Sequence, residues 1–334
     1  MRIEITAYTA AGCALGERLC AVLQKEGEDA RFRSGKGENG IKAKDWAAEY
    51  FPAADALIFI GAAGIAVRSI APLAASKLSD PAVLVLDDGG RFAVSLLSGH
   101  VGGANDLTRR VAGITGGIPV ITTATDGRGL FAIDSWAAKC GFFIANPEKI
   151  KAVSGKLLDG RQVGLWTPFP IAGELPAGFF WTETAPDAAV SVRRPVTDCL
   201  WLVPPVLTLG VGCRKDTPAE AIEAAFEELL RQTGFSEKAF RQVCSIDLKA
   251  EEPGLLAFCE KRGLPFRTFS GEELSALPGE FTPSAFVSRI TGVDNVCERS
   301  AVKGSGGEIV CPKQAGGGVT MAAAMETPAL DFGM

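Results

Sequence analysis

The chain has a single histidine, His100, in a glycine-rich segment that follows a strand-like run and precedes a helix-like one. Histidine is the side chain best suited to moving protons near neutral pH. Gly99, Gly102 and Gly103 allow a sharp turn and a close approach of a ligand to the backbone. The segment therefore indicates acid–base chemistry at a strand end, although a tight turn in which the histidine only caps or packs explains the same residues.

Further junctions between strand-like and helix-like runs are also rich in glycine and polar groups. They are residues 61–68, 122–128 and 210–215. In a parallel sheet the carboxyl ends of the strands share one edge, so we expect the junctions of one domain to face a common crevice. Each has a simpler explanation as well: Gly61 and Gly64 permit a tight turn, and Thr125 or Asp126 suits the N-cap of a helix.

The junction at 210–215 leads into a predicted helix with Thr217 as its N-cap, Pro218 at its first position and Glu220 completing a capping box. Arg214 and Lys215 lie just before this helix. Cations there oppose the helix dipole, which favours an anionic ligand over simple solvation of the two side chains.

A fifth candidate segment, residues 295–301, carries Glu298 beside Arg299, which form a structural ion pair or act as functional groups. None of the glycine runs in the chain matches the dinucleotide fingerprint or the phosphate-binding loop. The sequence therefore gives no reason to infer a nucleotide.

Composition excludes several classes of function. The net charge is −5 and there is no basic tract, which argues against nucleic-acid binding. The nine cysteines are scattered without a C-x-x-C pair, so neither a zinc site nor a disulfide framework is expected. No apolar run reaches the ~18 residues of a membrane span, and the first ten residues read as a strand, not as a signal peptide. We expect a cytoplasmic protein without a membrane segment.

The order of elements predicts an α/β fold with doubly wound, mainly parallel sheets in an N-terminal and a C-terminal domain. The expected divisions are residues 1–145, a proline-rich middle domain or connection at 146–205, and residues 206–334. In the first domain the segment Asp87-Asp88-Gly89-Gly90 signals a hairpin turn. The predicted strands are residues 3–9, 56–60, 81–86, 92–97, 118–122, 162–167, 206–211, 243–248 and 319–324.

Long runs of the sequence resemble a known family. "FIGAAGIAVRSIAPL", "DPAVLVLDDGGRFAVSLLSGHVGGANDLTRRVA" and "PVITTATD" are similar to the N-terminal part of the CbiG family of anaerobic cobalamin biosynthesis. "LGVGCRKDTPAEAIEAAFEELL", "SIDLKAEEPGLLAFCEKRGLPF", "FVSRITGVDNVCERSAV" and "GGVTMAAAM" resemble its C-terminal domain, which is shared with CobE of the aerobic pathway. The resemblance covers residues 1–326 and is weakest in the proline-rich middle.

The resemblance implies a cobalt-precorrin-5A hydrolase, which opens a δ-lactone on a cobalt-containing tetrapyrrole and releases acetaldehyde. Such an enzyme needs water and no organic cofactor, since the cobalt arrives inside the substrate, and other enzymes of the pathway are conceivable partners. A second hypothesis is a non-catalytic carrier of corrinoid intermediates, which binds the substrate without releasing acetaldehyde. A third, a nucleotide-binding regulator, predicts stabilisation by a nucleotide.

For this reaction we expect His100 to act as the base for water or as the acid toward the leaving alkoxide. Asp106 or Asp126 would orient the imidazole, and Ser98 would position the water. The amides of Gly102 and Gly103 would receive the oxyanion. Cations at the macrocycle's rim are expected from Arg68, Arg128, Arg214 and Lys215. The full set expected to bind substrate is Gly61, Gly64, Arg68, Gly102, Gly103, Asn105, Thr123, Thr125, Arg128, Gly212, Cys213, Arg214, Lys215 and Glu298, with no metal ligand.

Overall fold

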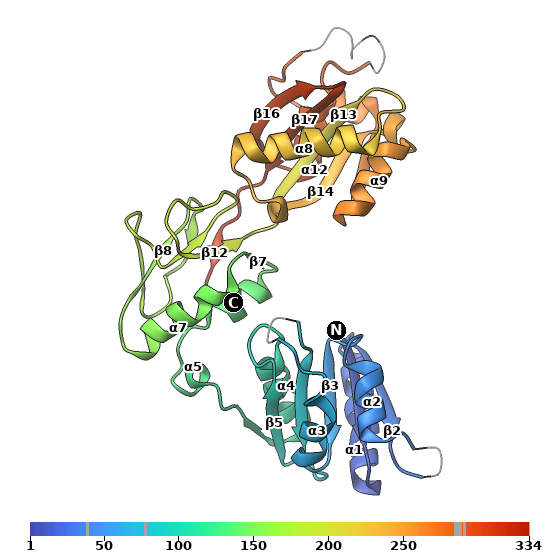
Figure 1. The fold of residues 1–334 in the computed structure, drawn as a ribbon, viewed down its shortest axis with the longest axis vertical. Helices are drawn as coiled ribbons and strands as arrows, with labels where there is room; N and C mark the ends of the chain where they lie inside the picture. Colours follow the sequence, from blue (N-terminus) through green and yellow to red (C-terminus); the bar gives the residue numbers. More distant parts are fainter. Residues whose placement is uncertain (38–39, 77–78, 284–288, 290–291, 334) are drawn as a thin grey trace. The chain divides into compact units, whose positions relative to one another are not determined.

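The computed structural model describes residues 1–37, 40–76, 79–283, 289 and 292–333. The chain divides into two compact units, Met1–Ser135 and Trp136–Met334 (Figure 1). Both contain β-sheets flanked by helices, as an α/β protein should. None of the helices in the described ranges is both long and apolar enough to span a bilayer.

The N-terminal unit holds a six-stranded sheet in the order β2-β1-β3-β4-β5-β6. The strands are β1 (Arg2–Ala7), β2 (Asp29–Ser34), β3 (Ala56–Ile60), β4 (Ala82–Leu86), β5 (Phe92–Leu97) and β6 (Ile118–Val120). The first four run parallel. The predicted hairpin turn joins β4 to β5, which is antiparallel to β4, and β6 runs parallel to β5. The carboxyl ends of β5 and β6 therefore lie at the opposite edge of the sheet from that of β3.

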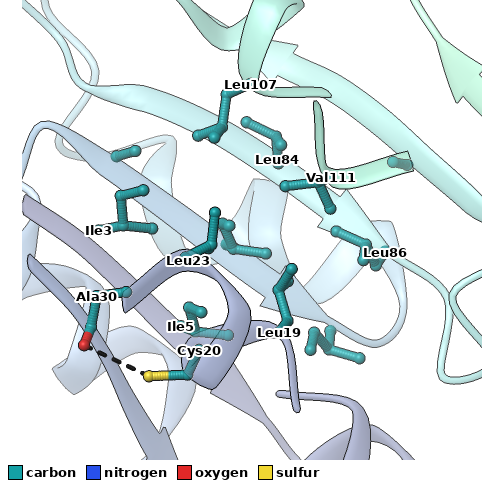
Figure 2. Close-up of a cluster of buried hydrophobic side chains, with 14 of the residues drawn as sticks. Ile3, Ile5, Leu19, Cys20, Leu23, Ala30, Leu84, Leu86, Leu107 and Val111 are labelled. Atoms are coloured by element: carbon teal, nitrogen blue, oxygen red, sulfur yellow. Dashed lines mark hydrogen bonds between the residues drawn. The ribbon is translucent and has the colours of Figure 1, made fainter. Parts of the chain in front are cut away.

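Helices cover both faces of this sheet. They are α1 (Ala10–Lys25) and α4 (Ala104–Thr115) on one face, and α2 (Ala43–Tyr50) and α3 (Ala63–Ile70) on the other. Two short helices, α5 (Ala124–Gly127) and α6 (Ile133–Lys139), follow β6 along the chain. On one face Leu19 and Leu23 of α1 and Val111 of α4 pack against Ile5 and Leu84 of the sheet (Figure 2). On the other face α2 and α3 pack around the fully buried Trp46. Successive side chains of a strand point to opposite faces, and helices cover both faces of this sheet. For this reason β3 and β4 are apolar throughout.

The second unit begins with a five-stranded sheet in the order β10-β8-β11-β12-β7, beside the helix α7 (Ile150–Leu158). The proline-rich segment thus forms short strands. These are β7 (Phe143–Ile144), β8 (Val163–Trp166), β9 (Ile171–Ala172), β10 (Phe179–Trp181), β11 (Ala188–Val190) and β12 (Leu200–Val203). The last strand of the chain, β18 (Leu330–Asp331), returns to pair with β9, and Trp136 donates a hydrogen bond to the carbonyl of Asp331.

The C-terminal sheet has the order β15-β14-β13-β17-β16. Its strands are β13 (Leu207–Cys213), β14 (Phe240–Ile246), β15 (Phe266–Phe269), β16 (Glu308–Gly316) and β17 (Val319–Met325), and its helices are α8 (Ala219–Thr233), α9 (Pro253–Arg262), α10 (Gly271–Ser275) and α12 (Cys297–Ser305). The first three strands run parallel, whereas β17 is antiparallel to β13 and to β16. Helix α8 lies across one face (Figure 1).

Two positions of the motif at 210–217 can now be described, the start of α8 and Gly210 of β13. The capping box predicted at Thr217 is wrong: α8 has Pro218 as its N-cap without a side-chain cap, and the Thr217 hydroxyl donates instead to the carbonyl of Arg214. Gly210 is required because α12 packs directly on β13, where a Cβ would stand 1.8 Å from the carbonyl oxygen of Cys297.

Candidate functional site

His100 lies between two carboxylates in the N-terminal unit. The loop after β5 presents its ring, whose Nε2 is 2.9 Å from Asp126 of α5. Nδ1 is 3.4 Å from Asp134, near the start of α6. Thr125 places its hydroxyl 3.2 Å from Nε2. The loops after β5 and β6 meet here because these neighbouring strands run in the same direction, as the sequence predicted for this pair.

The two carboxylates favour a charged imidazole. The hydrogen bond that the ring donates to Asp134 raises the pKa of His100 above its usual value, against the opposing effect of burial, and Asp126 raises it further. Burial alone would raise the pKa of Asp126, but hydrogen bonds from Thr123, Arg109 and His100 outweigh it and hold that pKa at about 2. The pKa of Asp134 is also lowered, since the bond to His100 outweighs its burial. The arrangement suits a proton donor better than a base.

Asn105 fixes the relative positions of these groups. Its side-chain amide donates to Thr123 at 3.0 Å and to Asp126 at 2.9 Å, and its carbonyl oxygen accepts from Ser95 at 2.7 Å. A Cβ on Gly99 would stand 2.8 Å from that oxygen, so only glycine fits there. Asn105 is buried and acts as a spacer between the two loops.

The remaining residues expected around His100 take varied places. Ser98 has a left-handed backbone with φ of 56°, and its buried hydroxyl has no hydrogen-bond partner among the described residues. The Gly103 amide already donates to the carbonyl of His100, which leaves Gly102 as the better oxyanion donor of the two. Asp106 is half exposed and pairs with Arg109, so the carboxylates on the imidazole are those of Asp126 and Asp134. Sequence reasoning did not select Asp134.

The junction that contains Gly61, Gly64 and Arg68 does not join this cluster. It follows β3, and the amide of Gly61 donates to Leu86 at the far end of β4. The expectation that all junctions of this domain share one edge is wrong, because the hairpin reverses β5 and β6. Arg68 is exposed and folds back over Gly64. Arg128 is exposed at the end of α5, on the His100 side of the sheet.

The second unit contains a cavity of about 950 Å³ at the carboxyl end of β13 and β14. Its wall includes Gly212, Cys213, Arg214 and Lys215, which the sequence singled out. The hairpin between β16 and β17 and the start of α9 complete it. Apolar side chains also line it, among them Ile246, Pro253, Val296 and Val319.

Two lysines of this cavity, Lys249 and Lys313, were missed by the sequence analysis. Lys249 follows β14, the parallel neighbour of β13, so the rule for strand ends could have found it. Its ammonium is 2.7 Å from Glu252, and this ion pair lowers the pKa of Glu252 although burial opposes the shift. Lys313 lies within β16, where no sequence signal marks it.

Two further residues on this wall were expected to contact substrate. Burial raises the pKa of the Cys213 thiol, which disfavours a nucleophilic thiolate there. The backbone amide of Arg214 donates to Gly318, and its side chain packs along the same glycine.

Glu298 lies behind the wall, only 1% exposed, and accepts hydrogen bonds from backbone and side-chain donors. Arg299 pairs with Asp294 instead, so Glu298 and Arg299 are not partners. In the part of the chain that the structure describes, no group of three or more histidine, cysteine or acidic side chains could hold a metal ion.

Comparison with known proteins gives a consistent result. Three family models match the chain: cobalamin synthesis G N-terminal at residues 45–126, the cobalamin biosynthesis central region at 131–202, and the cobalamin synthesis G C-terminus at 207–324. A cobalt-precorrin-5A hydrolase of Salmonella typhimurium is 36% identical over 92% of this chain and 93% of its own length. One from Priestia megaterium is 32% identical over 80% and 78%. Protein CobE of a Sinorhizobium species is 36% identical over 31% of this chain and 68% of its own.

Proposed function

The chain belongs to the CbiG family of cobalt-precorrin-5A hydrolases of anaerobic cobalamin biosynthesis, and from this premise we propose which residues bind the substrate and which move its protons. The cavity at β13 and β14 is the proposed binding site for the macrocycle. The observation that carries this assignment is one cavity of about 950 Å³ that combines apolar side chains with four basic ones, although its wall also holds Asp216, Glu251 and Glu252, the last paired with Lys249.

The chemistry of the substrate supports the assignment. A corrinoid precursor is flat, apolar on its faces and edged with carboxylates, so its site needs an apolar surface flanked by cations. Ile246 and Val296 supply the first, and Arg214, Lys215 and Lys313 supply the second. Charge-assisted bonds to carboxylates are about twice as strong as neutral ones, which makes these cations the main source of orientation.

His100 is the proposed proton donor. Lactone opening requires water to add to the ester carbonyl and the ring oxygen to leave as an alkoxide, which must take up a proton. An imidazolium held between Asp126 and Asp134 would carry that proton, and both carboxylates raise the pKa of His100 and so favour this charged form. Of the two roles expected for His100, general acid is therefore favoured over general base. The Gly102 amide is the proposed donor to the oxyanion.

Steady-state kinetics of acetaldehyde release test both assignments. Replacing Arg214 or Lys215 with glutamine should raise KM about tenfold with little change in kcat, since one charged contact contributes about 1.5 kcal/mol or more. His100→Asn should lower kcat by about a hundredfold or more. Lys261→Gln is the matched control, because Lys261 is 68% exposed and pairs with Glu223 outside the cavity wall.

The outcomes separate the two assignments. Unchanged KM in both cavity variants would mean that the cavity does not bind the macrocycle, and would not bear on the role of His100. An undiminished kcat in His100→Asn would remove the histidine and leave the cavity.

A further inference from the structure

Glu298 is a buried carboxylate with four hydrogen-bond donors around it. Oε1 accepts from the Thr282 hydroxyl at 3.0 Å and from the Lys313 amide at 2.7 Å. Oε2 accepts from the Thr282 amide at 2.7 Å and from the Asn295 side chain at 2.6 Å. Each carboxyl oxygen thus accepts two hydrogen bonds, and three of the four donors are N–H groups.

The four donors come from three separate stretches of chain, two of which form the cavity wall. Asn295 and Lys313 both line the cavity, whereas Glu298 does not. The side-chain carbonyl oxygen of Asn295 also accepts from the Glu298 amide, in the first turn of α12, at 2.8 Å. Glu298 thus ties the start of α12 to the middle of β16, where the pairing with β17 is irregular on both sides of Cys311.

We propose that Glu298 is a positioning residue for substrate binding, which holds the backbone of Lys313 so that the lysine ammonium stands in the wall of the cavity. The inference rests on the proposed function, since it assumes that Lys313 contacts a carboxylate of the macrocycle. Burying a carboxyl group is costly unless its hydrogen bonds are satisfied, and a purely apolar contact between α12 and β16 would not fix the register of an irregular strand. The carboxylate fixes it through hydrogen bonds from both segments.

Glu298→Gln is the informative variant because it keeps size and shape. In either orientation of the new amide, its NH₂ group faces a backbone or side-chain N–H that needs an acceptor. The segment that carries that N–H then loses its hydrogen bond to residue 298. We expect KM to rise about five- to tenfold with kcat changed by less than twofold. Glu228→Gln, on the exposed face of α8 and paired with Arg231, is the control and should leave both unchanged.

A double-mutant cycle with Lys313→Ala separates positioning from general stability. If Glu298 acts through Lys313, adding Glu298→Gln to Lys313→Ala should change KM by less than twofold. If the two effects on KM multiply, the inference is overturned. It is also overturned if Lys313→Ala raises KM but Glu298→Gln alone does not, a result that leaves the proposed function standing.

If Lys313→Ala leaves KM unchanged while Arg214→Gln raises it, the inference fails and the cavity assignment survives. If neither variant raises KM, the cavity assignment itself fails. Should Glu298→Gln not fold, Thr282→Val removes one donor from the same carboxylate and takes its place in the cycle. It should raise KM about twofold in the presence of Lys313 and not in its absence.

Discussion

Asp126 should stabilise the N-terminal unit, and replacing it with asparagine measures by how much. Its pKa falls from 3.8 to about 2 in the folded state, and its side chain is only 16% exposed. A difference of this size corresponds to about 2 kcal/mol of folding free energy at pH 7. Asp29→Asn is the control, since Asp29 and its partner Arg31 are both more than half exposed and such pairs contribute little.

The pH dependence gives this prediction its sign. A lowered carboxyl pKa stabilises the fold above the unfolded value of 3.8, and the contribution disappears as the pH falls through the folded value of about 2. The difference between wild type and Asp126→Asn should therefore be full at pH 7 and fall to about half by pH 3.

Urea unfolding followed by the imidazole resonances of His100 measures it, because the chain's one histidine reports on this unit directly. The reasoning is refuted if Asp126→Asn lowers the free energy of unfolding by less than about 0.5 kcal/mol at pH 7. It is also refuted if the decrease at pH 3 is as large as the decrease at pH 7.

Other expectations follow from the same contacts. Asp134→Asn should lower the pKa of His100, which an NMR titration of the lone imidazole detects; an unmoved titration would mean that the carboxylate does not act on the ring. Because the pKa of His100 is raised in the fold, its contribution to stability should be full below pH ~6.5 and decline as the pH rises through the folded value. The urea midpoints of wild type and His100→Asn should therefore differ most below pH ~6.5 and converge as the pH rises. Gly210→Ala should destabilise the C-terminal sheet by about 3 kcal/mol or prevent folding, since its Cβ would overlap the Cys297 carbonyl; thermal melts should show this and no loss for the control Gly155→Ala, which meets open space.

Local patterns in the sequence were sufficient for many of the elements, although not for β2, β15 and β16, and for half of the His100 cluster. The apolar runs and the Asp87–Gly90 turn predicted β3, β4 and β5 closely. The same turn implied that β5 and β6 run against β3, which separates Gly61 and Arg68 from His100. The prediction that the junctions share one edge holds only for strands that are all parallel, and β5 is antiparallel to β4.

Other parts of the sites depend on pairings that a single sequence does not display. Asp134 reaches His100 from a helix 34 residues further along the chain, and nothing near it marks a catalytic residue. Lys313 lies in an irregular antiparallel strand, and its place in the cavity wall is set by Glu298 and by the pairing with β17. The Thr217 capping box failed because the helix begins one residue later than predicted, with Pro218 as its N-cap, and the Thr217 hydroxyl donates to the Arg214 carbonyl.

The position of the substrate's cobalt tests the cavity assignment most directly. Crystals of the His100→Asn variant soaked with cobalt-precorrin-5A, measured at the cobalt absorption edge, would locate the metal by its anomalous scattering alone. The account predicts one strong peak inside the cavity, flanked by Arg214 and Lys313 and above Ile246 and Val296. A fully occupied peak elsewhere, with this cavity empty, would contradict it.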